Sequence, residues 1–207
     1  MGSAILGIVA GLPGLIIAMV VHEYAHARVA VAQGDFTPRL MGRLTLNPMA
    51  HIDPLGFVAL LLVRFGWAKP VIVNPANFKH GRRSDIMVSL AGPGANLLTA
   101  FVALFFVQIY WRMGFPVSEG MREVFLLIVF YNINFAVFNL LPLPPLDGAK
   151  VVEKLLPPRM AYQFLMLERY SLLIMIILMV TPVLRYVLIP CSQFIYSIFS
   201  ILIGIIV

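Results

Sequence analysis

The sequence predicts an all-α polytopic membrane protein with a three-helix core, one or two further C-terminal transmembrane helices, and a short membrane-associated β-like or re-entrant region. Two observations carry this prediction. Hydrophobic residues make up 61% of the 207 residues and charged residues only 12%, with a mean hydropathy of +0.95, which is not typical of a soluble domain. The hydrophobic runs are also long and continuous rather than alternating, which favours transmembrane helices.

Three apolar stretches supply the expected core: residues 4–30, 86–111 and 124–141. Each is close to or above the roughly 20 residues that cross a hydrocarbon layer. The stretch 55–63 is apolar too, but a helix of this length covers only about half of that layer. We therefore expect it to be re-entrant or interfacial and not to cross.

The remainder of the chain is divided by prolines. Residues 170–184 and 186–207 predict one or two further spans, interrupted by Pro182 and Pro190. We expect a single membrane domain over residues 1–207, with a core at about 4–156 and a C-terminal transmembrane region at about 160–207. No Lys or Arg precedes the first apolar stretch, so we expect a retained helix and not a cleaved signal peptide.

Turn-forming residues mark the connections. Asn-Pro, Asp-Pro and Gly-Asp dipeptides between 33 and 54 predict irregular backbone, and the segment 67–75 contains a short β-like run at 71–73. Within the second span, residues 89–96 carry a Gly-Pro-Gly break that ends at Asn96. This segment is either a kink with small-residue packing or a direct part of a site.

The C-terminal part of the first span carries three ionisable side chains, His22, Glu23 and His26. The two histidines are four residues apart, so on a helix they lie one turn apart on the same face. Two imidazoles at this spacing can bind one zinc ion, with the intervening Glu23 beside its water as a general base. The alternative is a polar helix end at the membrane surface, but polar groups near membrane depth are more often functional.

A catalytic zinc ion usually takes three protein ligands, and Asp147 is the best candidate for the third. It follows the third span directly, after three prolines between 142 and 145 that prevent a regular helix, and before Gly148, which permits a tight backbone path. We expect a carboxylate on stiff, non-helical backbone; the alternative is an Asp-Gly turn at the membrane surface. Two full crossings separate Asp147 from the histidines, so both lie on one side if 55–63 does not cross.

The net charge of +6 is distributed by topology. The basic residues lie mostly in loops, which argues against nucleic-acid binding and matches the positive-inside rule. The loop between the second and third spans holds Arg112 and Arg122, balanced by Glu119 and Glu123. The other side, which carries the predicted metal site, is rich in basic residues and is therefore expected to face the cytoplasm: Arg28, Arg39, Arg43, Lys69, Lys79, Arg82, Arg83, Lys150, Lys154, Arg159 and Arg169.

These motifs resemble the site-2 protease family of intramembrane zinc metalloproteases, in particular its compact prokaryotic members without a PDZ or CBS domain. The resemblance rests on residues 22–26 and 139–148, is supported by 47–56, 67–70 and 89–96, and covers roughly residues 15–155. It implies that His22, His26 and Asp147 bind zinc, that Glu23 activates the water, and that Asn139 helps to hold the substrate or stabilise the oxyanion.

The resemblance also implies partners and location. The family cleaves transmembrane segments of membrane proteins, often to release a transcription regulator or an anti-sigma factor. We therefore expect a transmembrane substrate protein, a lipid bilayer and residence in the cell membrane. The β-like run at 71–73 could pair with an unwound substrate as an added strand. His51 stays without an assigned role.

Two rival interpretations come from other classes. A metal-ion transporter could use the same histidines and aspartate, but it would be expected to place polar ligands along a path through several spans. An inactive relative could serve as a scaffold, although the presence of Glu23 argues against this. The chain has one cysteine, Cys191, so it has neither an internal disulfide nor a cysteine zinc site.

Overall fold

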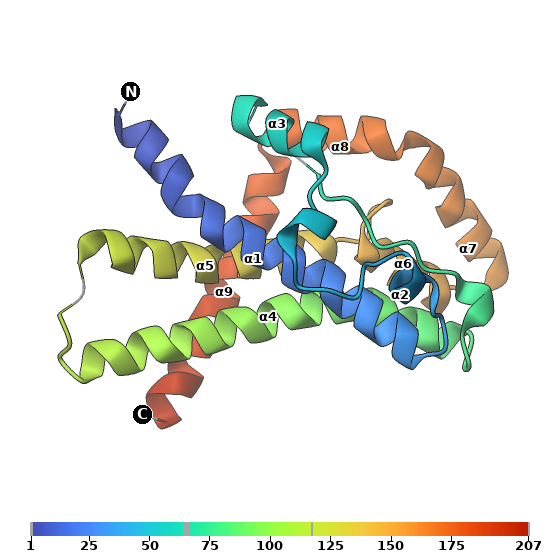
Figure 1. The fold of residues 1–207 in the computed structure, drawn as a ribbon. Coiled ribbons are helices and arrows are strands. Elements are labelled where there is room, and N and C mark those ends of the chain that lie inside the picture. Colours follow the sequence, from blue (N-terminus) through green and yellow to red (C-terminus); the bar gives the residue numbers. More distant parts are fainter. Residues whose placement is uncertain (1, 64–66, 117, 207) are drawn as a thin grey trace.

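The computed structural model describes residues 2–63, 67–116 and 118–206, which form helices and loops (Figure 1). Five helical stretches within these residues are long and apolar enough to cross a membrane. The prediction of an all-α polytopic membrane protein is confirmed. The described residues form no strand, and a single isolated antiparallel bridge joins Ile52 to Ala68.

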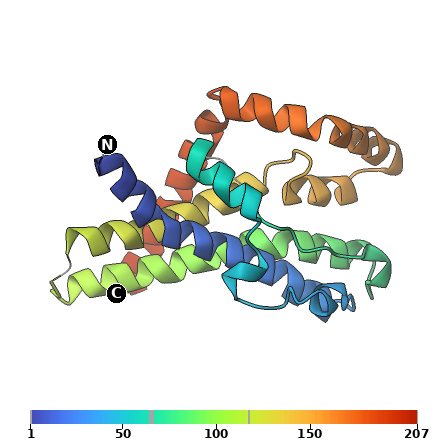
Figure 2. The same cartoon turned by 45° about the horizontal axis from the view of Figure 1, so that its top comes forward.

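The three long helices α1 (Gly2–Ala32), α4 (Arg82–Arg112) and α5 (Glu119–Asn139) pack against one another as the expected three-helix core (Figures 1 and 2). Part of the contact between α4 and α5 is an apolar cluster, in which Leu104, Val129 and Ile133 are almost fully buried. In a bilayer, close packing of this kind holds helices together, because lipid is as apolar as the side chains.

Helix α4 passes through the Gly-Pro-Gly sequence without a break, although the sequence predicts one there. Pro93 removes one helical hydrogen bond but lies inside the helix, as is common in transmembrane helices whose neighbours satisfy the freed groups. Gly92 and Pro93 are both buried, so the small-residue packing that the sequence allows is what the structure contains.

The connection between α1 and α4 holds only short helices: α2 (Thr37–Leu40), the 3₁₀ helices η1 (Pro48–Ala50) and η2 (Pro75–Asn77), and α3 (Pro54–Val63). Helix α3 has 10 residues and so a length of about 15 Å, which is too short to cross, as predicted. Asn47 and Asn74 each accept a hydrogen bond from a backbone amide two residues on and precede a proline, which explains the two 3₁₀ turns.

The C-terminal part contains α6 (Asp147–Leu155), α7 (Pro158–Leu165), the 3₁₀ helix η3 (Met166–Tyr170), α8 (Ser171–Val180) and α9 (Val183–Ile206). By length and composition, both Pro158–Leu178 and α9 can cross a membrane, so the chain has room for two further spans. Helix α9 packs against α5 and α4, whereas α8 packs mainly against its chain neighbours η3 and α9 (Figures 1 and 2).

Candidate metal centre

Three side chains from distant parts of the chain converge at one point. The Nε2 atoms of His22 and His26 lie 3.0 Å apart, and Oδ2 of Asp147 lies 3.1 Å from the first and 3.0 Å from the second. All three residues are buried. The two histidines lie on α1 and Asp147 begins α6, so the structure brings together the trio that spacing and topology predict as metal ligands.

The outer nitrogens of the two rings show which atoms face the cluster. Nδ1 of His26 lies 2.8 Å from the carbonyl oxygen of Val88, which can only accept, so this nitrogen is the donor. Nδ1 of His22 lies 2.8 Å from Oδ1 of Asn96, whose amide nitrogen is turned to the carbonyl of Ala18. The Nε2 lone pairs of both rings therefore point into the cluster, towards a carboxylate.

This arrangement fits a metal ion. Three acceptor atoms about 3 Å apart repel one another unless a cation or a proton lies among them. Tetrahedral ligands with bonds of 2.0–2.1 Å lie roughly 3.3 Å from one another, close to the separations found here. The cluster of His22, His26 and Asp147 could therefore hold one metal ion, and two imidazoles with one carboxylate are donors that suit zinc.

Asp147 reaches the histidines by a different local structure from the one expected. The sequence predicts a non-helical backbone at this residue, but Asp147 is the first residue of α6, with Leu146 as its N-cap. A carboxylate is favourable in the first turn of a helix, and proline is compatible with the segment before it. The prediction of non-helical backbone is thus wrong for Asp147 and right for residues 140–146 that precede it.

Two glycines let the backbone approach the centre. A Cβ on Gly92 of α4 would lie 2.6 Å from Cε1 and 2.7 Å from Nδ1 of His22, so only glycine allows α4 to pack directly on the imidazole. A Cβ on Gly148 would lie 2.5 Å from the carbonyl carbon of Leu140, which lets α6 turn back against the end of α5. The segment 89–96 therefore supports the centre both by packing and through Asn96.

Glu23 lies beside the cluster and not in it. It is buried, and its Oε2 accepts a hydrogen bond of 2.9 Å from the backbone amide of Val71. Residues 71–74 form no strand, and two of their backbone amides donate to side chains: Val71 to Glu23 and Asn74 to Asp35. The β-like run is therefore an extended loop attached to the predicted general base.

A cavity of about 910 Å³ lies over these residues. His22, Glu23 and His26 form its floor, the loop 67–75 forms one wall, and the end of α5 with α8 forms the others. The lining is mainly apolar, with side chains such as Ile72, Phe138 and Met175. The arrangement can enclose a peptide segment of apolar character next to the candidate metal ligands.

The remaining predicted residues fall in different places. Asn139 lines the cavity, but its Nδ2 donates to the carbonyl of Phe135 on its own helix, at 2.9 Å. Its role towards substrate stays a prediction. His51 is fully buried in the loop before α3, where its ring donates to the carbonyl of Thr45 and its own carbonyl accepts from Lys69. Within the described residues it is not part of the metal-binding group.

Sequence reasoning misses three supporting residues. Lys150 places Nζ 3.2 Å from Oδ1 of Asp147, which leaves Oδ2 to the histidines. Asp35 accepts bonds from Thr37, the amide of Asn74 and the side chain of Asn77, and so fastens the cavity wall to the end of α1. Asn132 is a fully buried amide in α5. For Asn132 the available signal is a side-chain amide within an apolar span, which also contains Asn134 and Asn139.

The fold and the site together define a multi-pass membrane protein with a centre of the metallopeptidase type. The chain belongs to peptidase family M50, the site-2 protease family, whose family model matches residues 107–182. It is 41% identical over 180 residues to "Putative zinc metalloprotease YwhC" of Bacillus subtilis (strain 168), covering 85% of this chain and 82% of that protein.

Two further relatives show the same likeness. "Putative zinc metalloprotease Rip2" of Mycolicibacterium smegmatis is 30% identical over 179 residues, covering 84% of this chain and 68% of that protein. "Stage IV sporulation protein FB" of Bacillus subtilis (strain 168) is 30% identical over 152 residues, covering 69% of this chain and 50% of that protein. No solved structure matches the chain.

Proposed function

We propose that this chain is a zinc-dependent endopeptidase that hydrolyses peptide bonds within transmembrane segments of other membrane proteins. The observation that carries the proposal is the meeting of His22, His26 and Asp147 under an apolar cavity, with Glu23 beside them. Zinc bound by these three ligands would polarise a carbonyl and acidify a water molecule. The family membership and the names of the relatives support this assignment.

Glu23 is the proposed general base. Its carboxylate lines the same cavity as the histidines, and the amide of Val71 holds one of its oxygens at 2.9 Å. A carboxylate held in this way can take a proton from water and return it to the leaving amine. A general acid–base group typically accelerates the reaction about 10²–10⁴-fold.

The loop 71–73 is the proposed docking edge for the unwound substrate. Ile72 is 55% exposed and lines the cavity between Val71 and Val73. An extended peptide can pair with the main chain of such a segment, while its side chains enter apolar pockets. Asn139 lines the same cavity, where its amide would turn from Phe135 towards a developing oxyanion.

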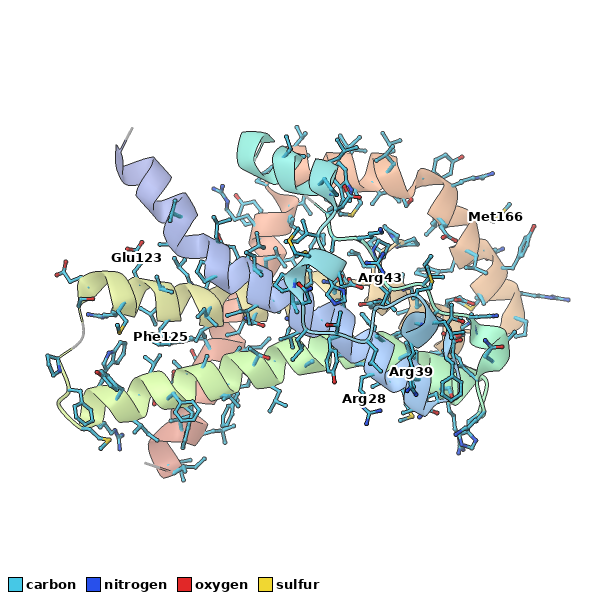
Figure 3. All side chains as sticks on the ribbon, viewed as in Figure 1. Arg28, Arg39, Arg43, Glu123, Phe125 and Met166 are labelled. Atoms are coloured by element: carbon cyan, nitrogen blue, oxygen red, sulfur yellow. The ribbon has the colours of Figure 1, made fainter. Side chains whose placement is uncertain are left out.

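We place this centre on the cytoplasmic side of a cell membrane. Arg28, Arg39 and Arg43 lie around the loop end of α1, whereas Glu123 and Phe125 mark the opposite end of the core (Figure 3). An excess of basic residues on one side marks the cytoplasmic face. Cleavage on this side would release the cytoplasmic part of a membrane protein, which suits regulated intramembrane proteolysis.

The test compares wild-type protein with Glu23→Gln, and Glu123→Gln serves as the matched control because Glu123 is exposed at the far end of α5 (Figure 3). Fragments of membrane proteins are quantified by mass spectrometry in cells that carry each form, and metal content is measured on the purified proteins. Fragments present with wild-type and control and absent with Glu23→Gln, at equal metal content, are expected.

The same proteins also distinguish a protease from the rival function, a metal-ion transporter. Fragments that persist with Glu23→Gln would end the protease proposal. Zinc flux into proteoliposomes without cleavage of any membrane protein would favour the metal transporter. Within the described residues, one group of His, Cys, Asp or Glu side chains could hold a metal, and it lies at one end of the core. A transporter would need polar ligands along a path through the membrane.

A further inference from the structure

We infer that Asn132 is a positioning residue that acts through Asn96 to decide which nitrogen of His22 faces the metal cluster. The inference rests on the proposed function to the extent that the cluster binds a metal ion. The three side chains come from three helices, Asn132 from α5, Asn96 from α4 and His22 from α1. Both asparagines are 0% exposed.

The direction of this relay is set by two backbone carbonyls. The carbonyl of Ile128 accepts from Nδ2 of Asn132 at 2.9 Å, so Oδ1 of Asn132 is turned towards Asn96. Nδ2 of Asn96 then donates to that oxygen at 3.0 Å and to the carbonyl of Ala18 at 2.8 Å, which uses both of its hydrogens. Oδ1 of Asn96 is left to accept from Nδ1 of His22 at 2.8 Å.

The opposite orientation is disfavoured. If the amide of Asn96 were flipped, its oxygen would face the carbonyl of Ala18 and Oδ1 of Asn132, which are both acceptors. A buried group left without a partner costs about 1–3 kcal/mol, and solvent cannot replace the lost bonds because both asparagines are fully buried. Asn132 thus supplies a second acceptor beside the carbonyl of Ala18, and both favour the same orientation of the Asn96 amide.

The consequence falls on the metal cluster. With its hydrogen on Nδ1, His22 presents an Nε2 lone pair to Asp147 and His26; with its hydrogen on Nε2, it would present an N–H and lose its function as a ligand. His26 does not need such a relay, because the carbonyl of Val88 accepts directly from its Nδ1. The two ligands of one motif are therefore oriented by different means.

The location of the asparagines argues against a role in binding substrate. Neither Asn96 nor Asn132 is among the described residues that line the cavity. Polar side chains buried at membrane depth are costly, and these two have no ionic partner that would explain them. Their described contacts are with each other, with main-chain carbonyls and with His22, which is what a positioning role requires.

The test uses metal affinity, which does not depend on catalysis. Asn132→Leu removes the acceptor for Asn96. Asn134→Leu is the matched control: its amide donates to the carbonyl of Phe130 in the same way, but its oxygen accepts from Ser192 of α9. Asn132→Asp is the restoring variant, because a neutral carboxylic acid can donate to Ile128 and accept from Asn96. Zinc affinity is measured by chelator competition on the full-length purified proteins, together with the visible spectrum of the cobalt forms.

We expect Asn132→Leu to weaken zinc binding by about tenfold or more and to change the cobalt spectrum, as loss of a residue that orients a ligand does. Asn134→Leu and Asn132→Asp should stay within about threefold of wild type. If Asn132→Leu does not yield folded protein, the comparison is made with Asn132→Ala, which removes the same acceptor.

Wild-type affinity and spectrum in both apolar variants of Asn132 would overturn the inference, as would an equal loss in Asn132→Leu and Asn134→Leu. These results differ from failure of the proposed function. That failure would appear as wild-type protein that binds no zinc, or that binds zinc and cleaves no membrane protein, whereas the inference fails on a comparison between variants of a metal-binding protein.

Discussion

The backbone amide of Val71 donates a hydrogen bond to Oε2 of Glu23, although the two residues are 48 positions apart in the chain; the nitrogen and oxygen are separated by 2.9 Å. The wall of the cavity is therefore attached to the carboxylate between the two histidines. A substrate strand that pairs with this wall would be placed directly beside the proposed general base, which connects docking with chemistry in one loop.

Replacing Ile72 with Pro should slow cleavage of a membrane-spanning substrate while leaving zinc content unchanged. Proline removes the Ile72 amide, which we propose pairs with the substrate, and it interrupts no helix or strand because residues 71–74 have no regular secondary structure. Ile72→Ala is the control, because it shortens the side chain and keeps the amide. Equal cleavage by wild type and Ile72→Pro would remove the docking proposal.

Gly92→Ala should disturb the metal centre, since the added Cβ would lie 2.6 Å from Cε1 of His22. Gly94→Ala, two residues further along α4, meets no atom within 4 Å and is exposed, so it is the matched control. We expect Gly92→Ala to lower zinc affinity by at least about tenfold, by analogy with changes that misorient a ligand. Chelator competition on both variants measures this, and equal affinities would show that α4 does not constrain the imidazole.

Lys150→Met should weaken zinc binding only modestly. Its ammonium contacts Oδ1 of Asp147 at 3.2 Å, but the lysine side chain is 58% exposed, and exposed ion pairs contribute roughly 0–1 kcal/mol. The expected loss of affinity is therefore about two- to fivefold, and Lys150→Arg should recover it. Loss of all zinc binding in Lys150→Met would show that this contact carries far more of the centre than its exposure indicates.

The hydrogen bonds of Asp35 predict that the attachment of the loop 67–75 depends on pH, and that the packing of the membrane helices does not depend on this group. Burial alone would raise the pKa of Asp35, but hydrogen bonds from Thr37, Asn77 and Asn74 outweigh it and hold the pKa below the ordinary value for Asp. A lowered pKa means that the charged form is favoured in the folded state. This stabilisation is fully present above the unfolded-state pKa of about 3.9 and is lost as the pH falls through the folded-state value.

Trp67, which begins the same loop, can report this change by fluorescence in a Trp111→Phe background. We expect acid to release the loop of the wild-type protein below about pH 4, and Asp35→Asn to show a weaker dependence on pH in that range. Identical acid transitions in the two proteins would show that Asp35 does not fasten the cavity wall.

Spacing along the chain predicts the part of the site that depends on local geometry. His22 and His26 are four positions apart, so any helix places them one turn apart on the same face, and counting two crossings places Asp147 on their side. This count of crossings assumes that the short stretch at 55–63 does not cross the membrane, and α3, with ten residues, is too short to do so. The proximity of these three side chains could be predicted because the period of a helix and the thickness of a bilayer are fixed quantities.

Contacts between helices lie beyond such reasoning. A single amide at position 132 does not reveal that it will meet Asn96, because this depends on how α4 and α5 are rotated about their axes. The same holds for Asp35 and Asn74, which meet across a loop. The predicted break in α4 is wrong, because the helix continues through Pro93 while Gly92 lies close to the imidazole of His22.

The zinc stoichiometry of purified protein, measured by elemental analysis after removal and restoration of the metal, tests the metal centre itself. We expect one zinc ion per chain in wild type and in Glu23→Gln, and little or none in His22→Ala or Asp147→Ala. Full zinc content in Asp147→Ala, or no zinc in wild type, would contradict a metal centre made by the two histidines of α1 and the first residue of α6.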